Sequence, residues 1–153
     1  MSTHRATITW QRDGGRFIGG DYTRVHRWRF DGGAEITASA SPEVVPAAYA
    51  DASAVDPEEA FVASLASCHM LWFLATAQRE GWIVDGYDDE ASGTLGRGPQ
   101  GRMQLVSITL RPRVTFAGAR GPSTEELARL HHDAHQSCFL AAVVTAPMTI
   151  EPR

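Results

Sequence analysis

The segment of residues 56–80 has the sequence DPEEAFVASLASCHMLWFLATAQRE and predicts the central element of the fold. Between Phe61 and Ala77 it contains no acidic or basic side chain other than His69. A helix that is apolar on every side is buried on every side. We therefore expect a long core helix, with Cys68, one of only two cysteines in the chain, near its middle.

Both ends of this helix carry sequence signals. Asp56 can cap the free N–H groups, Pro57 suits the first helical position, and Glu59 completes a capping box with Asp56. Gly81 is a suitable residue to end the helix.

The composition is that of one ordinary globular domain, which we expect to cover residues 1–153. The net charge of −4 and the absence of a basic cluster argue against nucleic-acid binding. The N-terminal residues contain no apolar leader segment, and the longest apolar run is interrupted by Ser67 and His69. We expect a cytoplasmic protein that does not span a membrane.

The order of predicted elements indicates an α+β fold. Three strands within residues 7–39 are expected to form an antiparallel meander, followed by a loop over residues 41–55 with one short helical turn. After the central helix, residues 82–96 and 103–116 are expected to pair as a hairpin. A second helix should begin at the capping box Ser123-x-x-Glu126 and end near Cys138, and residues 140–150 should form a last strand.

The two cysteines permit two interpretations. Cys68 and Cys138 lie 70 positions apart and form no CxxC motif, so they match neither a thioredoxin motif nor a zinc ribbon. They can be two buried cysteines with a packing role, because free cysteine is among the most buried residue types. Alternatively they form a redox pair, in which one thiolate is oxidised to a sulfenic acid and the other condenses with it to a disulfide.

A redox role for Cys68 requires a cation, because an apolar surround disfavours the thiolate. The candidates are Arg24, Arg27 and Arg29, and Glu58 is the natural carboxylate to orient one of them. Glu58 and Cys68 lie about 15 Å apart along a straight helix. If both serve one site, a second copy of the chain must supply one of them; otherwise Glu58 interacts only with the helix dipole.

Four segments carry a family resemblance. They are DPEEAFVASLASC at residues 56–68, LHHDAHQSCFLA at residues 130–141, Tyr22-x-Arg24-x-His26, and Tyr87-Asp88 followed by Gly93. The two cysteine motifs occur together, in order and at a characteristic separation, so their combination is specific. On these segments the sequence resembles the OsmC/Ohr family of organic hydroperoxide reductases over nearly its whole length.

This resemblance implies a peroxidatic Cys68, a resolving Cys138, and a polar network made by Glu58 and Arg24. It implies the OsmC-like fold, an intertwined homodimer with antiparallel sheets wrapped around central helices. The implied activity is the reduction of alkyl or fatty-acid hydroperoxides to alcohols, with a dithiol reductant such as a lipoylated protein as electron donor and with no metal, haem or flavin cofactor.

The sequence also permits two functions other than peroxide reduction. Cys68, His69, His131, His135 and Cys138 together could bind a transition metal, although the compact ligand pairs of known structural sites are absent. A non-catalytic stress or ligand-binding dimer is the other alternative. It is favoured by Ala142 and Val143, which stand where many relatives carry Asn and Ser.

Overall fold

The computed structural model describes residues 1–118 and 120–153, which divide into two compact units, Met1–Ala60 and Phe61–Arg153. The expectation that residues 1–153 form a single domain remains a prediction.

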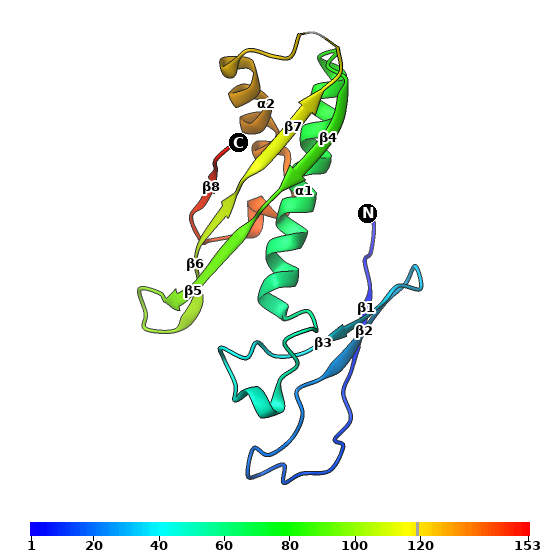
Figure 1. Cartoon of the computed structure of the whole chain (residues 1–153), viewed down its shortest axis with the longest axis vertical. Coiled ribbons are helices and arrows are strands. Elements are labelled where there is room, and N and C mark those ends of the chain that lie inside the picture. Colours follow the sequence, from blue (N-terminus) through cyan, green and yellow to red (C-terminus); the bar gives the residue numbers. More distant parts are fainter. Residues whose placement is uncertain (119) are drawn as a thin grey trace. The chain divides into compact units, whose positions relative to one another are not determined.

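The first unit is built on a three-stranded antiparallel sheet. It contains β1 (Ala6–Thr9), β2 (His26–Phe30) and β3 (Glu35–Ala38) in the order β1-β2-β3, as the expected meander requires (Figure 1). The turn between β2 and β3 places Gly33 at a φ of 87°, a conformation that glycine adopts without strain. Residues 21–25 are not part of a strand, so the expected strand region is shorter than predicted, and the short helical turn in the loop is η1 (Ala47–Tyr49).

The predicted central helix is α1 (Pro57–Arg79). The capping box at its start is confirmed, because Glu59 N donates to Asp56 Oδ1 at 2.7 Å and Asp56 N donates to Glu59 Oε2 at 3.1 Å. The helix ends where predicted: Gly81 adopts a φ of 81°, and Trp82 N donates to Ala77 O at 3.0 Å.

The expected long hairpin is present, but it is divided into two sheets. β4 (Val84–Asp89) pairs with β7 (Pro112–Phe116), and β5 (Ser92–Arg97) pairs with β6 (Met103–Leu110), all antiparallel (Figure 1). The prediction of two unbroken strands was therefore wrong. The Asp89 side chain accepts a hydrogen bond from Arg111 N at 2.6 Å, so this N–H does not pair with a backbone carbonyl of the neighbouring strand. Pro112 has no N–H, so the strand pairing lacks two successive backbone donors at this point.

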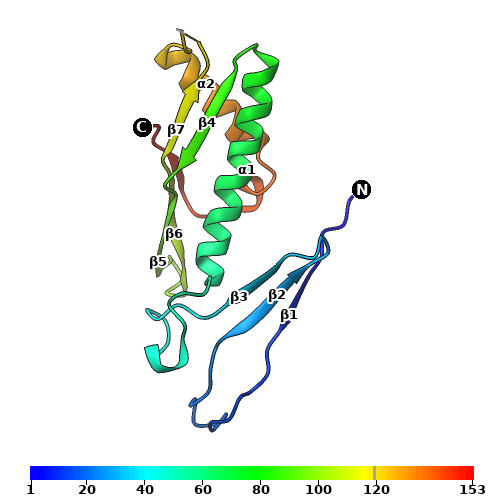
Figure 2. The ribbon, with the colours of Figure 1, turned by 45° about the vertical axis from the view of Figure 1, so that its right-hand side comes forward.

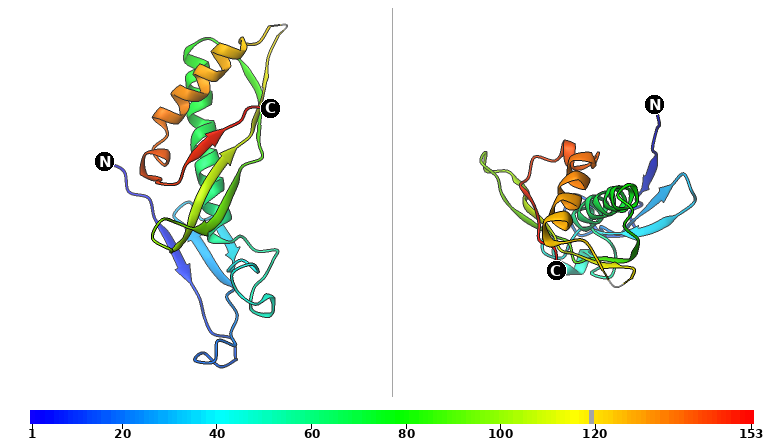
Figure 3. Two further views of the ribbon diagram at one scale, coloured as in Figure 1. Left: turned by 90° about the vertical axis from the view of Figure 1, so that its left-hand side faces the viewer. Right: turned by 90° about the horizontal axis from the view of Figure 1, so that it is seen from above.

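The second helix, α2 (Thr124–Ser137), begins at the predicted capping box, and Cys138 is its C-cap residue. The prediction of one strand over residues 140–150 was wrong for most of that range. A 3₁₀ turn, η2 (Ala141–Val143), comes first, and only β8 (Met148–Ile150) is a strand. It pairs with β6 in parallel and begins after Pro147, which cannot donate to a ladder (Figure 3).

Two apolar clusters hold the second unit together. One contains Phe73 and Ala77 of α1 with Leu130 and Ala134 of α2, packed against residues of β4 and β7. The other cluster joins Leu65 of α1 to Ile108 and Leu110 of β6. In Figures 1 and 2, α1 runs beside the strands of the second unit. By length and hydropathy α1 could cross a membrane, but its fully buried apolar residues Leu65, Phe73 and Ala77 lie within these clusters, as in a core helix.

Candidate functional site

The two cysteines meet across the helices of the second unit. Cys68 lies in the middle of α1, and Cys138 lies where α2 ends. The Cys138 thiol donates to Cys68 Sγ with 2.8 Å between the two sulfur atoms, and both cysteines are free. The sulfur atoms are close enough that a disulfide can form after small side-chain rotations.

The surroundings of the two thiols differ. Cys138 is buried, with 1% of its surface exposed, whereas Cys68 is half-buried. Burial, with the hydrogen bond to Cys68 as a smaller cause, raises the pKa of the Cys138 thiol. Cys138 therefore stays protonated near neutral pH and acts as the hydrogen-bond donor, and Cys68 is the more exposed of the two residues.

Two buried histidines lie between the same helices. His69 Nε2 and His131 Nδ1 are 3.1 Å apart, and the outer nitrogens, His69 Nδ1 and His131 Nε2, have no partner among the described residues. Burial, with smaller effects of His131 and His135, lowers the pKa of His69 to about 4, and burial lowers the pKa of His131 to about 4. Both imidazoles are neutral at pH 7, so neither supplies a cation for a thiolate.

Arg24 lies in the first unit, between the Gly19-Gly20 turn and β2. Its Nη1 donates to Gly20 O at 2.9 Å and to Tyr22 O, and its guanidinium lies over the Tyr22 ring, 3.6 Å from the centroid. These contacts hold the guanidinium in one place without a carboxylate partner among the described residues.

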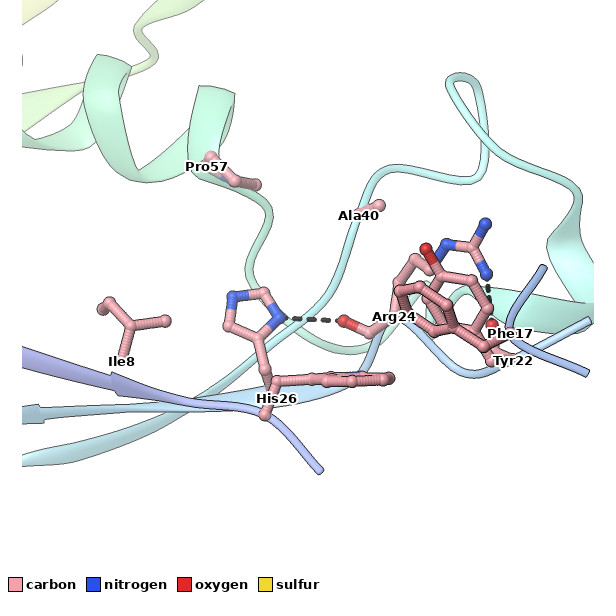
Figure 4. Close-up of a pocket in the computed structure, with 8 residues that line it drawn as sticks. Ile8, Phe17, Tyr22, Arg24, His26, Ala40 and Pro57 are labelled. Carbon is pink, nitrogen blue, oxygen red and sulfur yellow. Dashed lines mark hydrogen bonds between the residues drawn. The ribbon is translucent and has the colours of Figure 1, made fainter. Parts of the chain in front are cut away.

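An apolar groove of about 420 Å³ surrounds this arginine within the first unit. Tyr22 stacks on Phe17 with 4.8 Å between ring centroids and meets Trp10 edge-on at 5.4 Å. His26 Nδ1 lies 2.8 Å from the carbonyl oxygen of Arg24 (Figure 4). The lining residues are Ile8, Trp10, Phe17, Tyr22, Arg24, His26, Ala40 and Pro57.

The other candidate arginines differ from Arg24. Arg29 Nε donates to Glu35 Oε1 at 2.7 Å, and Arg27 Nη1 lies 3.6 Å from Glu35 Oε2 on the same face of the sheet. Glu58 occupies the first turn of α1, and no ion pair joins it to Arg24 within the part of the chain that the structure describes. The structure therefore brings Cys68 and Cys138 together within the second unit, whereas Arg24 and Glu58 belong to the first unit.

A comparison with protein families shows to which family this chain is related. The model of the OsmC-like protein family matches residues 50–153, which include α1, both cysteines and the histidine pair. This chain belongs to the OsmC-like family. Its α+β fold is the fold of that family.

Solved structures of similar proteins cover this OsmC-like chain almost completely. An OsmC-like protein of unknown function from Vibrio cholerae is 44% identical, with a TM-score of 0.96 over 100% of both chains. An organic hydroperoxide resistance protein from Elizabethkingia anophelis is 20% identical, with a TM-score of 0.72 over 100% of this chain and 98% of that one. One from Bacillus subtilis is 18% identical, with a TM-score of 0.70 over 99% and 98%. No match was found among the curated proteins.

The histidines of this OsmC-like chain are not grouped as the metal-site hypothesis requires. The described residues contain no group of three or more His, Cys, Asp or Glu side chains placed to hold a metal ion. His69 instead binds His131 directly. The sequence analysis grouped His69 with His131 and His135 as possible metal ligands, but it did not predict the direct hydrogen bond between His69 and His131, which depends on the packing of α1 against α2.

Proposed function

We propose that this protein is a thiol-dependent peroxidase that reduces organic hydroperoxides to alcohols. The observation that carries the proposal is the contact between the Cys68 and Cys138 sulfur atoms at 2.8 Å, in a chain of the OsmC-like family. Two similar structures are of organic hydroperoxide resistance proteins, and their names support the same activity. The half-buried Cys68 is the attacking sulfur, and the buried Cys138 is the resolving one.

The reaction has two steps. The Cys68 thiolate attacks one oxygen of the peroxide; the O–O bond breaks, Cys68 becomes a sulfenic acid, and the alkoxide takes up a proton to leave as the alcohol. The Cys138 sulfur then attacks the sulfenic sulfur, so that a disulfide forms and water leaves. The hydroperoxide is reduced by two electrons, which the two thiols supply together.

The roles of Arg24 and Glu58 complete the proposed mechanism. Arg24 stabilises the thiolate and the departing alkoxide through its fixed charge, and Glu58 orients Arg24. Glu58 and Cys68 are ten residues apart on one helix, about 15 Å along its axis, so a second copy of the chain brings one of these groups to the site. The family resemblance implies an intertwined homodimer, which supports the proposal that this chain forms one; a cytoplasmic location is proposed with it.

The substrate and reductant follow from the same chemistry. An apolar site favours alkyl or fatty-acid hydroperoxides over hydrogen peroxide, because each buried methylene of the substrate contributes about 0.8 kcal/mol. A dithiol, for example a lipoylated protein, regenerates the two thiols by thiol–disulfide exchange.

Thiol titration tests the proposal most directly. One equivalent of cumene hydroperoxide should remove two titratable thiols per chain, and dihydrolipoamide should restore them. Cys68→Ser should consume no peroxide, whereas Cys138→Ser should stop at the sulfenic acid, which a sulfenic-acid probe detects.

Two outcomes would contradict the proposal. Consumption of peroxide by Cys68→Ser at the wild-type rate would remove the assigned nucleophile. A wild-type protein that keeps both thiols after several equivalents of organic hydroperoxide would instead support the non-catalytic dimer.

A further inference from the structure

A buried histidine pair crosses the same helix interface as the two thiols. His69 directly follows Cys68 on α1, and His131 precedes Cys138 by seven residues on α2. Residues seven apart lie on the same face of a helix, so one face of α2 presents both His131 and Cys138 to α1. The exposed fraction is 0% for His69 and 3% for His131.

The geometry of the pair is that of a hydrogen bond between ring edges. The two ring planes are only 8° apart, and the centroids are separated by 5.4 Å. The distance between the centroids exceeds the 3.1 Å between the bonded nitrogens by about one ring width, which is what half of each ring adds when the rings lie edge to edge. The hydrogen bond therefore lies nearly in the plane of both rings. Such a bond is strongly directional, and it fixes how α2 is rotated and shifted against α1.

The pair is also tied to the core. The Phe73 ring, one turn after His69 on α1, packs against His131 with 4.4 Å between centroids, and Phe73 itself is fully buried. His131 is therefore held by two α1 side chains at once. The apolar contacts of Leu130 and Ala134 hold α2 on α1 as well, but apolar contacts tolerate sliding more than a hydrogen bond does.

Stability alone does not explain two histidines at this position. Each has one buried ring nitrogen without a partner in the described part of the chain, and an unsatisfied buried polar atom is destabilising. Replacing both members of such a pair by apolar side chains of similar size is often neutral or stabilising.

We propose that the His69–His131 hydrogen bond is a positioning device that holds Cys68 and Cys138 in contact and so favours their disulfide. Without this bond, the end of α2 samples more positions, and the effective concentration of one thiol at the other falls. The significance of the pair in catalysis rests on the proposed peroxidase function, but its effect on the thiols does not.

The test measures the equilibrium between the protein dithiol and glutathione disulfide, in which the protein disulfide forms and two glutathione molecules are released. His131→Leu and His69→Leu remove the bond, and each should lower this equilibrium constant about threefold to tenfold, the range that corresponds to one net hydrogen bond. His131→Asn and His69→Gln keep an amide nitrogen or oxygen near the bonded ring nitrogen. These two should stay within about twofold of the wild type.

Two further variants serve as controls. His132→Leu makes the same substitution at the neighbouring exposed position of α2 and should leave the constant unchanged. His69→Leu/His131→Leu leaves no unpaired partner, so it should fold with wild-type or higher thermal stability and still show the lowered constant. This combination of retained stability and weakened disulfide separates positioning from a purely structural role.

The proposal is overturned if the leucine variants, including the double variant, form the disulfide with the wild-type constant. It is also overturned if His131→Asn is as impaired as His131→Leu. A wild type that shows no peroxidase activity would contradict the proposed function, yet the glutathione equilibrium would still report on the histidine pair.

Discussion

At the scale of single residues, the sequence predicted the thiol pair better than its surroundings. Cys68 and Cys138 were expected to act together, and their sulfur atoms are in contact. His69 was grouped with His131 and His135 from the sequence, but its direct hydrogen bond to His131 was not predictable, because it depends on the rotation of α2 about its own axis. A spacing of four between His131 and His135 indicates only that they share a helix face, not what they contact.

The two buried histidines make stability dependent on pH. The pKa of each is lowered to about 4 in the folded protein, against an ordinary value of 6.5. The unfolded chain therefore binds more protons between these values, and the free energy of unfolding should be highest above pH 6.5 and fall as the pH drops towards 4. Both histidines should contribute to this loss, because each must take up a proton that its buried position disfavours.

Urea unfolding at pH 7 and at pH 5 measures this loss. The matched variant is His69→Gln/His131→Asn, whose amides do not titrate, and it should lose distinctly less stability over the same interval. Equal losses in the wild type and the variant would show that the histidines are not the groups responsible.

Gly93 is a second single residue with a structural consequence. A Cβ atom placed there would lie 2.7 Å from Val62 Cγ2 of α1 and 3.1 Å from Leu105 Cδ2 of β6. Gly93→Ala should therefore destabilise the protein by about 1–3 kcal/mol through overpacking. Gly32→Ala is the control, since no atom lies within 4 Å of its Cβ position, and thermal unfolding should show it close to the wild type. A Gly93→Ala protein as stable as Gly32→Ala would contradict the close approach.

At the scale of elements, helix ends were predictable and strand ends were not. The capping boxes at Asp56 and Ser123 and the stop at Gly81 all depend on local chemistry, and each was confirmed. The division of the long hairpin depends on a hydrogen bond between Asp89 and Arg111, 22 positions apart, which no local pattern contains. The parallel pairing of β8 with β6 is equally non-local.

The α2 capping box should make a measurable contribution. Glu126 N donates to Ser123 Oγ at 3.3 Å, and Ser123 N donates to Glu126 Oε2 at 2.8 Å, a bond that lowers the pKa of Glu126. Ser123→Ala should lower the free energy of unfolding by about 1 kcal/mol, whereas Ser123→Asp, which retains a capping oxygen, should lower it by much less. Chemical denaturation compares the two, and equal losses would argue that the cap contributes nothing.

At the scale of the whole molecule, one chain leaves much of its apolar surface uncovered. The exposed fraction is 60% for Leu71 on α1, 73% for Phe139 and 76% for Val143. The apolar sequence of α1 predicts a helix that is buried on every side, but in a single chain Leu71 of this helix remains exposed. The same segment also raised the question of how Glu58 and Cys68 could serve one site, and the proposed second copy of the chain would account for both observations.

Leu71→Glu tests the proposed dimer, because burying an unpaired carboxylate in an apolar interface is strongly unfavourable. Sedimentation equilibrium should show twice the chain mass for the wild type and a shift towards one chain mass for the variant. Ala128→Glu adds the same charge at an exposed position of α2 and should remain dimeric. A dimeric Leu71→Glu protein would exclude Leu71 from the interface, and a monomeric wild type would contradict the dimer itself. The two thiols meet within one chain, whereas Glu58 lies about 15 Å from Cys68 along α1. The monomeric variant should therefore still be oxidised to its Cys68–Cys138 disulfide by glutathione disulfide, with release of two glutathione molecules, but lose peroxidase activity.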